Sequence, residues 1–110
     1  MQRGEVYRVA EPTAERGGKP GFYVVVSRDE VAENERLSTV ICAPIYSSIL
    51  GLSTEVVITP QEGVRHTSAI RCDLLASIFK SRLTKLVGRL PPARMFELDA
   101  ALAEALGLPV

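Results

Sequence analysis

The sequence contains few of the residues that build metal centres or disulfide frameworks. It has one histidine and two cysteines, and Cys42 and Cys72 lie far apart, so no zinc-type ligand cluster is visible. Both cysteines stand in apolar, strand-like stretches, which favours buried, reduced thiols in a cytosolic protein. A structural disulfide is the alternative. We therefore expect no metal site and no cofactor.

Long apolar runs are absent too. The longest, such as 22–26 and 40–44, are too short to cross a bilayer. The first residues, MQRGEVYRV, lack the apolar core of a secretory signal. With 46% hydrophobic and 24% charged residues, the composition is that of an ordinary globular chain, and 110 residues suit one domain. We expect a cytoplasmic protein without membrane contact, formed by one domain over residues 1–110.

The net charge is zero, which by itself argues against a polyanionic partner. The charges are unevenly distributed, however. Residues 29–62 carry six acids and one base, whereas residues 65–94 carry seven bases and one acid. This asymmetry permits a local basic surface on a neutral molecule, and scattered, solvated charges are the equally supported alternative.

Short strands dominate the pattern up to residue 90, because β-branched and aromatic residues alternate with turn-forming segments. We expect strands over 4–9, 21–27, 38–46, 54–59 and 83–90, and at least one long or bent strand within 67–79. Residues 10–20 are predicted to form a loop, and 28–37 a polar segment with one helical turn. Pro44 predicts an edge or a bulge near the end of its strand.

The last segment changes to a helical period. Its apolar residues are spaced three and four apart, at Met95, Leu98, Leu102 and Leu106. Pro91 and Pro92 suit the first turn, and Gly107 followed by Pro109 ends the helix. The predicted fold is mainly β (α+β), with five to seven short strands in a strongly bent sheet or barrel. The amphipathic helix packs over one open side.

Five motifs, in order, resemble the MazF/PemK family of toxin ribonucleases. "RGEVYRV" is similar to its opening strand, and "KPGFYVVVSRDE" to its R-P-x-x-V-V-S-N-D segment. "TVICAPIYS" resembles the strand T-v-v-V-P-I-T-S. "SAIRCDLLASIFKSRLTKLVGRL" resembles the D-Q-I-R core that precedes a basic R-L and an I-G-x-L strand, and "LDAALAEALGL" the terminal helix. The resemblance covers nearly the whole chain.

The resemblance implies a small SH3-like β-barrel with a C-terminal helix. It implies a toxin of a toxin–antitoxin module, a homodimer that a small MazE-like antitoxin protein blocks. Its activity would be that of a metal-independent, sequence-specific endoribonuclease that cleaves single-stranded RNA and so inhibits translation and growth. Two alternatives are a non-catalytic RNA- or protein-binding barrel of the same fold and, with weaker support from the motifs, a toxin that poisons DNA gyrase.

Such an enzyme activates the ribose 2′-hydroxyl to attack the adjacent phosphorus, and placed cations stabilise the charge that grows on the phosphoryl oxygens. The family usually has its main catalytic arginine directly before the proline of the second motif, where this chain has Lys19 before Pro20. Lysine cannot grip a phosphate bidentately, but it loses its proton more readily when desolvated. Lys19 is therefore the predicted catalytic cation or base, with Arg16 as second candidate. An exposed loop lysine is the alternative.

The family also carries a threonine or serine pair after P-I, whose hydroxyls hold the scissile phosphate. Here Tyr46 and Ser47 stand at these positions and Ser48 follows. Ser47 keeps a hydroxyl and is predicted to contact the phosphate, and Ser48 to contact RNA. Tyr46 can donate a hydrogen bond or stack on a base, or it can cap the strand end.

Other polar residues receive secondary predictions. Arg28 replaces an asparagine that borders the family's RNA groove, and Arg82 matches a basic position, so both are candidate RNA contacts. His66 is the natural residue for acid–base work, but it matches no catalytic position and is predicted to be a surface histidine. Asp73 is expected to be hydrogen-bonded for structural reasons.

Overall fold

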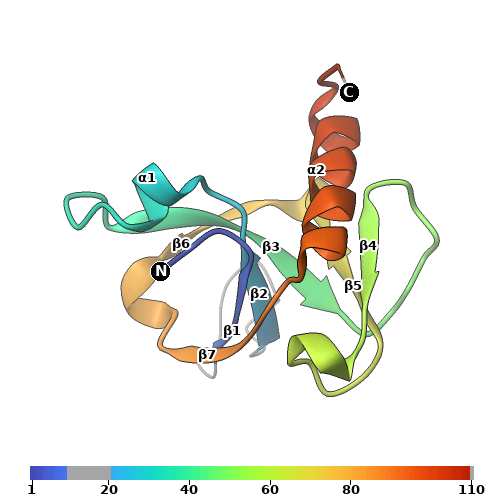
Figure 1. The fold of residues 1–110 in the computed structure, drawn as a ribbon, viewed down its shortest axis with the longest axis horizontal. Coiled ribbons are helices and arrows are strands. Elements are labelled where there is room, and N and C mark those ends of the chain that lie inside the picture. Colours follow the sequence, from blue (N-terminus) through green and yellow to red (C-terminus); the bar gives the residue numbers. More distant parts are fainter. Residues whose placement is uncertain (10–20, 110) are drawn as a thin grey trace.

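The computed structural model describes residues 1–9 and 21–109 and shows a curled antiparallel sheet with a helix against one end (Figure 1). The strands are β1 (Glu5–Val9), β2 (Gly21–Val25), β3 (Thr39–Tyr46), β4 (Glu55–Ile58), β5 (Ser68–Arg71), β6 (Ala76–Phe79) and β7 (Lys85–Arg89). The α-helices are α1 (Asp29–Ala32) and α2 (Pro92–Leu106), and the short 3-10 turns are η2 (Pro60–Glu62), η3 (Cys72–Leu74) and η4 (Lys80–Arg82). The predicted fold class is confirmed.

The sheet follows the order β4-β5-β3-β2-β1-β7, and β6 also pairs with β3. The stretch 67–79 therefore contributes two strands rather than one, because η3 interrupts it. Both strands pair with the same side of β3. β6 pairs with residues Thr39 to Cys42, and β5 pairs with Ile45 and Tyr46. This exchange of partners bends the sheet around β3.

The prediction that Pro44 marks an edge or a bulge is wrong, because β3 lies inside the sheet. Pro44 pairs in register with Tyr23 of β2. On its other side it lies between the last residue paired with β6, Cys42, and the first paired with β5, Ile45. A proline cannot donate a ladder hydrogen bond. It is tolerated here because β3 changes partners at this point.

The C-terminal helix begins and ends as predicted. Pro91 caps its start, and Gly107 takes the left-handed conformation, with φ of +69°, at its end. α2 packs against η3 and β4, with Leu98 and Ala101 buried. Leu106, expected on the buried face, is 57% exposed, and the alanines 101 and 105 pack inward instead. Small residues let the helix approach the sheet closely at that end.

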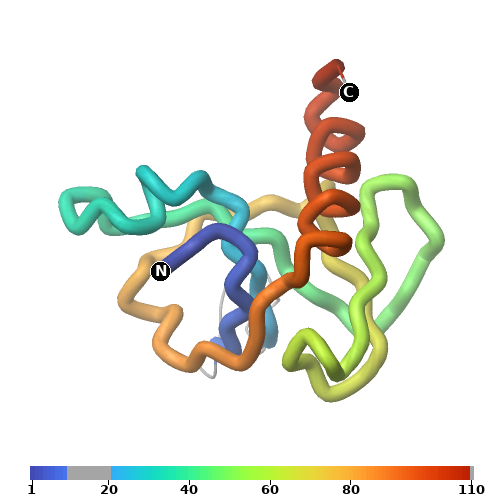
Figure 2. Tube along the Cα trace, in the orientation of Figure 1, coloured from blue at the N-terminus to red at the C-terminus, as the bar shows by residue number. Residues whose placement is uncertain are grey.

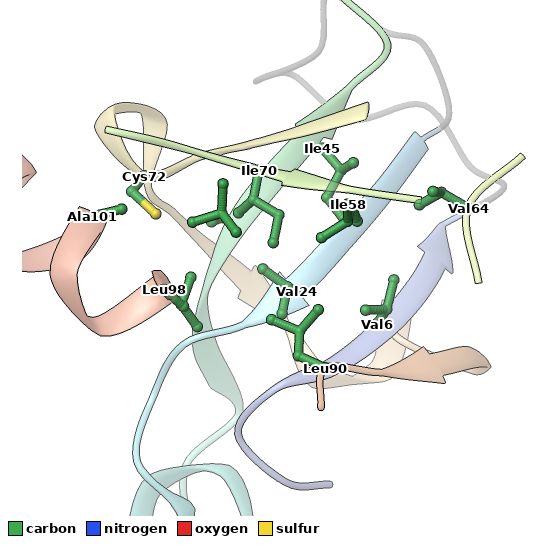
Figure 3. Packing of buried hydrophobic residues seen from close by; sticks show 12 residues of the cluster. Val6, Val24, Ile45, Ile58, Val64, Ile70, Cys72, Leu90, Leu98 and Ala101 are labelled. Atoms are coloured by element: carbon green, nitrogen blue, oxygen red, sulfur yellow. The ribbon is translucent and has the colours of Figure 1, made fainter. Parts of the chain in front are cut away.

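Apolar side chains form one cluster on each face of the sheet. The first lies between the curled sheet and α2 and includes Val6, Ile45, Ile70 and Leu98 (Figure 3). The second, on the opposite face, includes Tyr7, Tyr23, Val40 and Ile78. Alternate residues of β1, β2 and β3 supply the two clusters, as strands with both faces covered require.

The cysteines divide between these clusters, Cys72 in the first and Cys42 in the second. Both are buried and neither forms a disulfide, which confirms the expectation of reduced thiols. Within the described residues, none of the helices is both long and apolar enough to cross a membrane.

Candidate functional site

A pocket of about 260 Å³ opens where β3 ends and β2 begins. Its lining residues are Gly21, Phe22, Ile45, Ser47, Val64, Arg65, His66 and Ser68. The apolar members Ile45 and Val64 belong to the first core cluster, so the pocket has a packed floor (Figure 3). Hydroxyl, imidazole and guanidinium groups of the other members surround that floor, which is a combination suited to a phosphate and a nucleobase.

Strand pairing brings these residues together from distant parts of the chain. Phe22 pairs with Ile45, which places the start of β2 beside the end of β3, and Ile45 pairs with Ile70 of β5. The turn before β5 is held by a hydrogen bond of 2.7 Å that the Ser68 hydroxyl donates to the carbonyl oxygen of His66. This bond fixes the backbone of His66 at the pocket wall.

A second hollow, of about 160 Å³, continues the first. It is lined by Arg8, Gly21, Phe22 and Arg65, and it shares the last three with the pocket. In the chain trace, the start of β2, the turn after η2 and the start of β7 lie at the same end of the molecule (Figure 2). The two hollows form one depression there, with Phe22 between them, and we call it the β2-end groove.

Comparison of the sequence with known proteins shows which family the chain belongs to. The model of the PemK-like, MazF-like toxin of type II toxin–antitoxin systems matches residues 2–106. The chain belongs to this family. It is 36% identical over 105 residues to the probable endoribonuclease MazF5 of Mycobacterium tuberculosis, a match that covers 94% of this chain and 91% of that protein. It is 30% identical to the endoribonuclease MazF1 of Mycobacterium bovis, over 97% of this chain and 93% of that protein.

Solved structures of similar fold support the same family. An endoribonuclease in complex with its cognate antitoxin, from a mycobacterial species, superposes with a TM-score of 0.83 at 27% identity. This match covers 100% of the chain and 98% of that structure. The toxin MazF-mt6 of Mycobacterium tuberculosis has the same fold, with a TM-score of 0.83 at 24% identity over 96% of this chain and 99% of that one. The predictions of the family, the fold and an endoribonuclease toxin are confirmed.

In this MazF-like toxin, the two predicted cations of the site lie outside the described residues. Lys19 and Arg16 belong to the segment 10–20, which the structure does not describe. Ser47 lines the pocket. Gly21, which only Pro20 separates from Lys19 in the chain, lines both hollows.

Tyr46 does not line the pocket, although it directly precedes Ser47. It pairs with Ala69 of β5, and its phenol lies near Arg71. The pKa of Arg71 is raised, mainly by its hydrogen bonds to Asp73 and in smaller part by the charge of Tyr46. Tyr46 is the last residue of β3, and Ser47 lies in the bend that follows it. Of the two residues that sequence reasoning had paired, only Ser47 lines the pocket.

The remaining predicted contacts lie away from the pocket lining. Arg28 precedes α1, beyond the other end of β2, and its guanidinium lies 3.6 Å from the Glu30 carboxylate on the surface. Ser48 is exposed next to the pocket, and Arg82 lies in η4 between β6 and β7. Asp73 is bound by Arg71 at 2.7 Å, and this hydrogen-bonded ion pair holds the pKa of its carboxyl below the usual range. Its predicted structural role is confirmed.

Sequence reasoning missed three residues of the β2-end groove. Arg8 and Phe22 were seen only as strand residues, and Arg65 only as one base among seven. His66 is exposed, as predicted for a surface histidine, but it also lines the pocket with Ser47. The available signal was the spacing of Arg8 on its strand, two residues after buried Val6. This spacing places Arg8 on the same face as the first cluster.

The described residues contain no group of three His, Cys, Asp or Glu side chains that could hold a metal ion.

Proposed function

We propose that this endoribonuclease toxin binds single-stranded RNA across the β2-end groove and cleaves it beside Ser47 in a short sequence context, without a metal ion. The observation that carries the proposal is the pocket that joins Ser47 to Arg65, His66 and Phe22. A hydroxyl and cations suit a phosphate, and a half-buried aromatic ring suits an unstacked base. Cleavage of this kind would lower translation and growth.

The chemistry needs only groups that the chain supplies. The 2′-oxygen of the ribose forms a bond to the adjacent phosphorus, its proton passes to a base, and the bond from phosphorus to the 5′-oxygen breaks. The 5′-oxygen takes up a proton, which leaves a 2′,3′-cyclic phosphate and a 5′-hydroxyl. Charge grows on the phosphoryl oxygens during the attack, and hydrogen-bond donors and cations placed there stabilise it.

Ser47 and Lys19 take the central roles in this proposal. The Ser47 hydroxyl donates to a non-bridging oxygen of the scissile phosphate. Lys19, two residues before Gly21 of the pocket lining in the sequence, serves as the cation or as the base. A lysine at such a place is effective only near the phosphate, because exposed charges are screened by solvent.

We also propose a homodimer and a small MazE-like antitoxin protein as partners. The structural relative at 27% identity is an endoribonuclease in complex with its cognate antitoxin, which supports the second partner. Large apolar side chains at the exposed face and end of α2 support a protein interface there, since Phe96 is 78% exposed. A cytoplasmic location fits the two free, buried cysteines, which a reducing compartment maintains.

The test is cleavage of a long RNA of mixed sequence in EDTA. The native protein is expected to produce discrete fragments. Lys19→Ala should lower the rate about 100-fold and Ser47→Ala about tenfold or more, since each removes a group that stabilises the transition state. Ser81→Ala, an exposed serine of η4, is the matched control and should cleave like the native protein.

Other results would change the assignment. Fragments that persist in Lys19→Ala would transfer the catalytic role to Arg16, Tyr46 or His66. A native protein that retards RNA in a gel without cutting it would indicate a non-catalytic binding barrel. Loss of cleavage only when EDTA is present would contradict the metal-independent mechanism.

A further inference from the structure

Most bases of the region 65–94 are held by neighbours in the fold. Four of them donate to carboxylate or carbonyl oxygens of described residues: Arg71 to Asp73, Lys80 to Val31 and Asn34, Arg89 to Glu5, and Arg94 to Glu62 and Glu97. Arg65 and Lys85, in contrast, form no ion pair with a described carboxylate, and neither does Arg8. Among the described residues, no carboxylate neutralises these three cations.

The strand register brings two of these cations into one row. Arg8 of β1 pairs with Phe22 of β2 on one side and with Lys85 of β7 on the other. Residues that pair directly across antiparallel strands project from the same face of the sheet. The row Phe22–Arg8–Lys85 therefore lies on one face, and it continues the Ile45–Phe22 pair at the pocket floor.

The third cation, Arg65, lies beside this row and comes from another element. Arg65 stands in the turn between η2 and β5, and it lines both the Ser47 pocket and the hollow of Arg8 and Phe22. The first core cluster supplies the apolar base below Phe22. In the described part of the molecule, the Ser47 hydroxyl, the Phe22 ring and the cations Arg8 and Lys85 thus follow one another along one face.

We propose that RNA leaves the Ser47 pocket along the row Phe22–Arg8–Lys85, with one base against the Phe22 ring and successive phosphates on Arg8 and Lys85. Arg65 binds the phosphate at the junction of the two hollows. This proposal rests on the proposed function, because it takes RNA as the ligand. Neighbouring strands lie about 4.8 Å apart, so long cationic side chains on β1 and β7 can reach separate phosphates. Stacking and backbone charge together are the usual means of holding a single strand.

The test separates ionic contacts from stacking by their salt dependence. Binding of a mixed-sequence 2′-O-methyl oligoribonucleotide, whose blocked 2′-oxygen prevents cleavage, is measured by fluorescence anisotropy over a series of salt concentrations. The logarithm of the association constant K falls as the logarithm of the salt concentration rises, and for a single strand each lost phosphate contact reduces the steepness of this fall by about 0.7. Arg8→Gln with Lys85→Gln should therefore make the negative slope shallower by about 1.4.

Matched variants provide the controls. Arg8→Lys keeps the charge and should keep the native slope. Arg36→Gln removes an exposed arginine between α1 and β3 and should also leave the slope unchanged. Phe22→Leu should weaken binding about tenfold at every salt concentration without changing the slope, because stacking releases no counterions. Thermal unfolding of each variant shows whether it is folded.

The results distinguish a failure of the RNA path from a failure of the proposed cleavage. A double variant with the native slope and affinity would overturn the RNA path, even if the native protein cleaves RNA. A slope that becomes equally shallow in Arg36→Gln would overturn it too. A native protein that cuts no RNA, yet shows the expected slopes, would refute the proposed catalysis and support the path.

Discussion

The neighbours Tyr46 and Ser47 have different surroundings, because β3 ends between them. Ser47 lines the pocket, whereas Tyr46 lies by Arg71 on the side of the Arg71–Asp73 ion pair. The family motif places a hydroxyl pair at these positions, and in this chain only one of the two lines the pocket. His66, in the turn before β5, lines the same pocket.

The His66 side chain gives a prediction at the residue scale. Its imidazole lines the pocket with Ser47, where a ring N–H can donate a hydrogen bond to a phosphate oxygen. His66→Ala removes this donor and should raise the KM for RNA several-fold, with kcat changed less than KM.

Steady-state cleavage kinetics of the native protein and His66→Ala would check this. Arg36→Gln serves as the control, because it also changes a polar side chain on the surface but lies outside the pocket lining. If His66→Ala keeps the native KM, His66 does not contact the phosphate.

The element that positions this side of the pocket is η2, which packs against β7 through two glycines. Gly63 follows η2 with φ of +102°, and a Cβ on Gly88 of β7 would overlap the carbonyl oxygen of Glu62. A second tie is the buried Glu62 carboxylate, which accepts hydrogen bonds from Thr59 at 2.9 Å and from Arg94 of α2 at 3.0 Å. Val64, Arg65 and His66 follow immediately, so the position of η2 decides where the pocket wall stands.

Gly88→Ala is the corresponding prediction at the element scale. The added methyl meets backbone, which cannot move aside as a side chain can, so the free energy of unfolding should fall by about 3 kcal/mol. RNA cleavage should fall as well, because a displaced η2 moves Arg65 and His66. Urea unfolding and fragment yield measure the two effects.

Gly51→Ala is the comparison for this experiment. Gly51 has φ of +77° but no atom within 4 Å of an added Cβ, so its substitution should cost only about 1 kcal/mol for the left-handed backbone. A Gly88→Ala variant as stable as Gly51→Ala would show that η2 and β7 separate without cost.

For the whole molecule, the two core clusters each contain a buried acid whose neutral form the fold favours. In the second cluster, burial and the nearby Glu5 carboxylate raise the pKa of Tyr7 from 10.0 to about 12. In the first cluster, burial and Asp73 raise the pKa of Cys72 from 9.0 to about 12. Ionisation of either group therefore weakens the fold on one face of the sheet.

The expected consequence is a loss of stability at alkaline pH. A raised pKa means that the folded chain keeps its proton where the unfolded chain has lost it. The free energy of unfolding should accordingly be constant up to pH 9 and then fall toward pH 12, by up to about 1.4 kcal/mol per pH unit for each group. Urea unfolding at a series of pH values measures this dependence.

Tyr7→Phe isolates one of the two contributions. This variant loses the 3.0 Å hydrogen bond from the Tyr7 hydroxyl to Glu5, so it should be less stable at neutral pH. Its further loss between pH 10 and pH 12 should be shallower than in the native protein. An equally steep loss would show that other groups cause the alkaline unfolding.

The sequence by itself determined the local structure and the family. Stretches of apolar, β-branched and aromatic residues between turn signals placed β1, β2, β3, β4 and β7, and period-3.6 spacing with Pro91 and Gly107 placed α2, because these signals arise within one element. The order of five motifs identified an endoribonuclease toxin. Local patterns did not show that η3 divides 67–79 or that Pro44 lies inside the sheet, since both depend on how β3 exchanges partners.

Only the tertiary structure decided which side chains meet. Arg8, Phe22, Arg65 and Ser47 come from four parts of the chain, and the antiparallel register of β1, β2, β3 and β5 brings them to one end of the sheet. It also decided which bases are paired and which keep a free charge, since Arg71, Arg89 and Arg94 find their carboxylates through folding. Register and pairing depend on contacts between residues distant in sequence, and local propensity does not encode them.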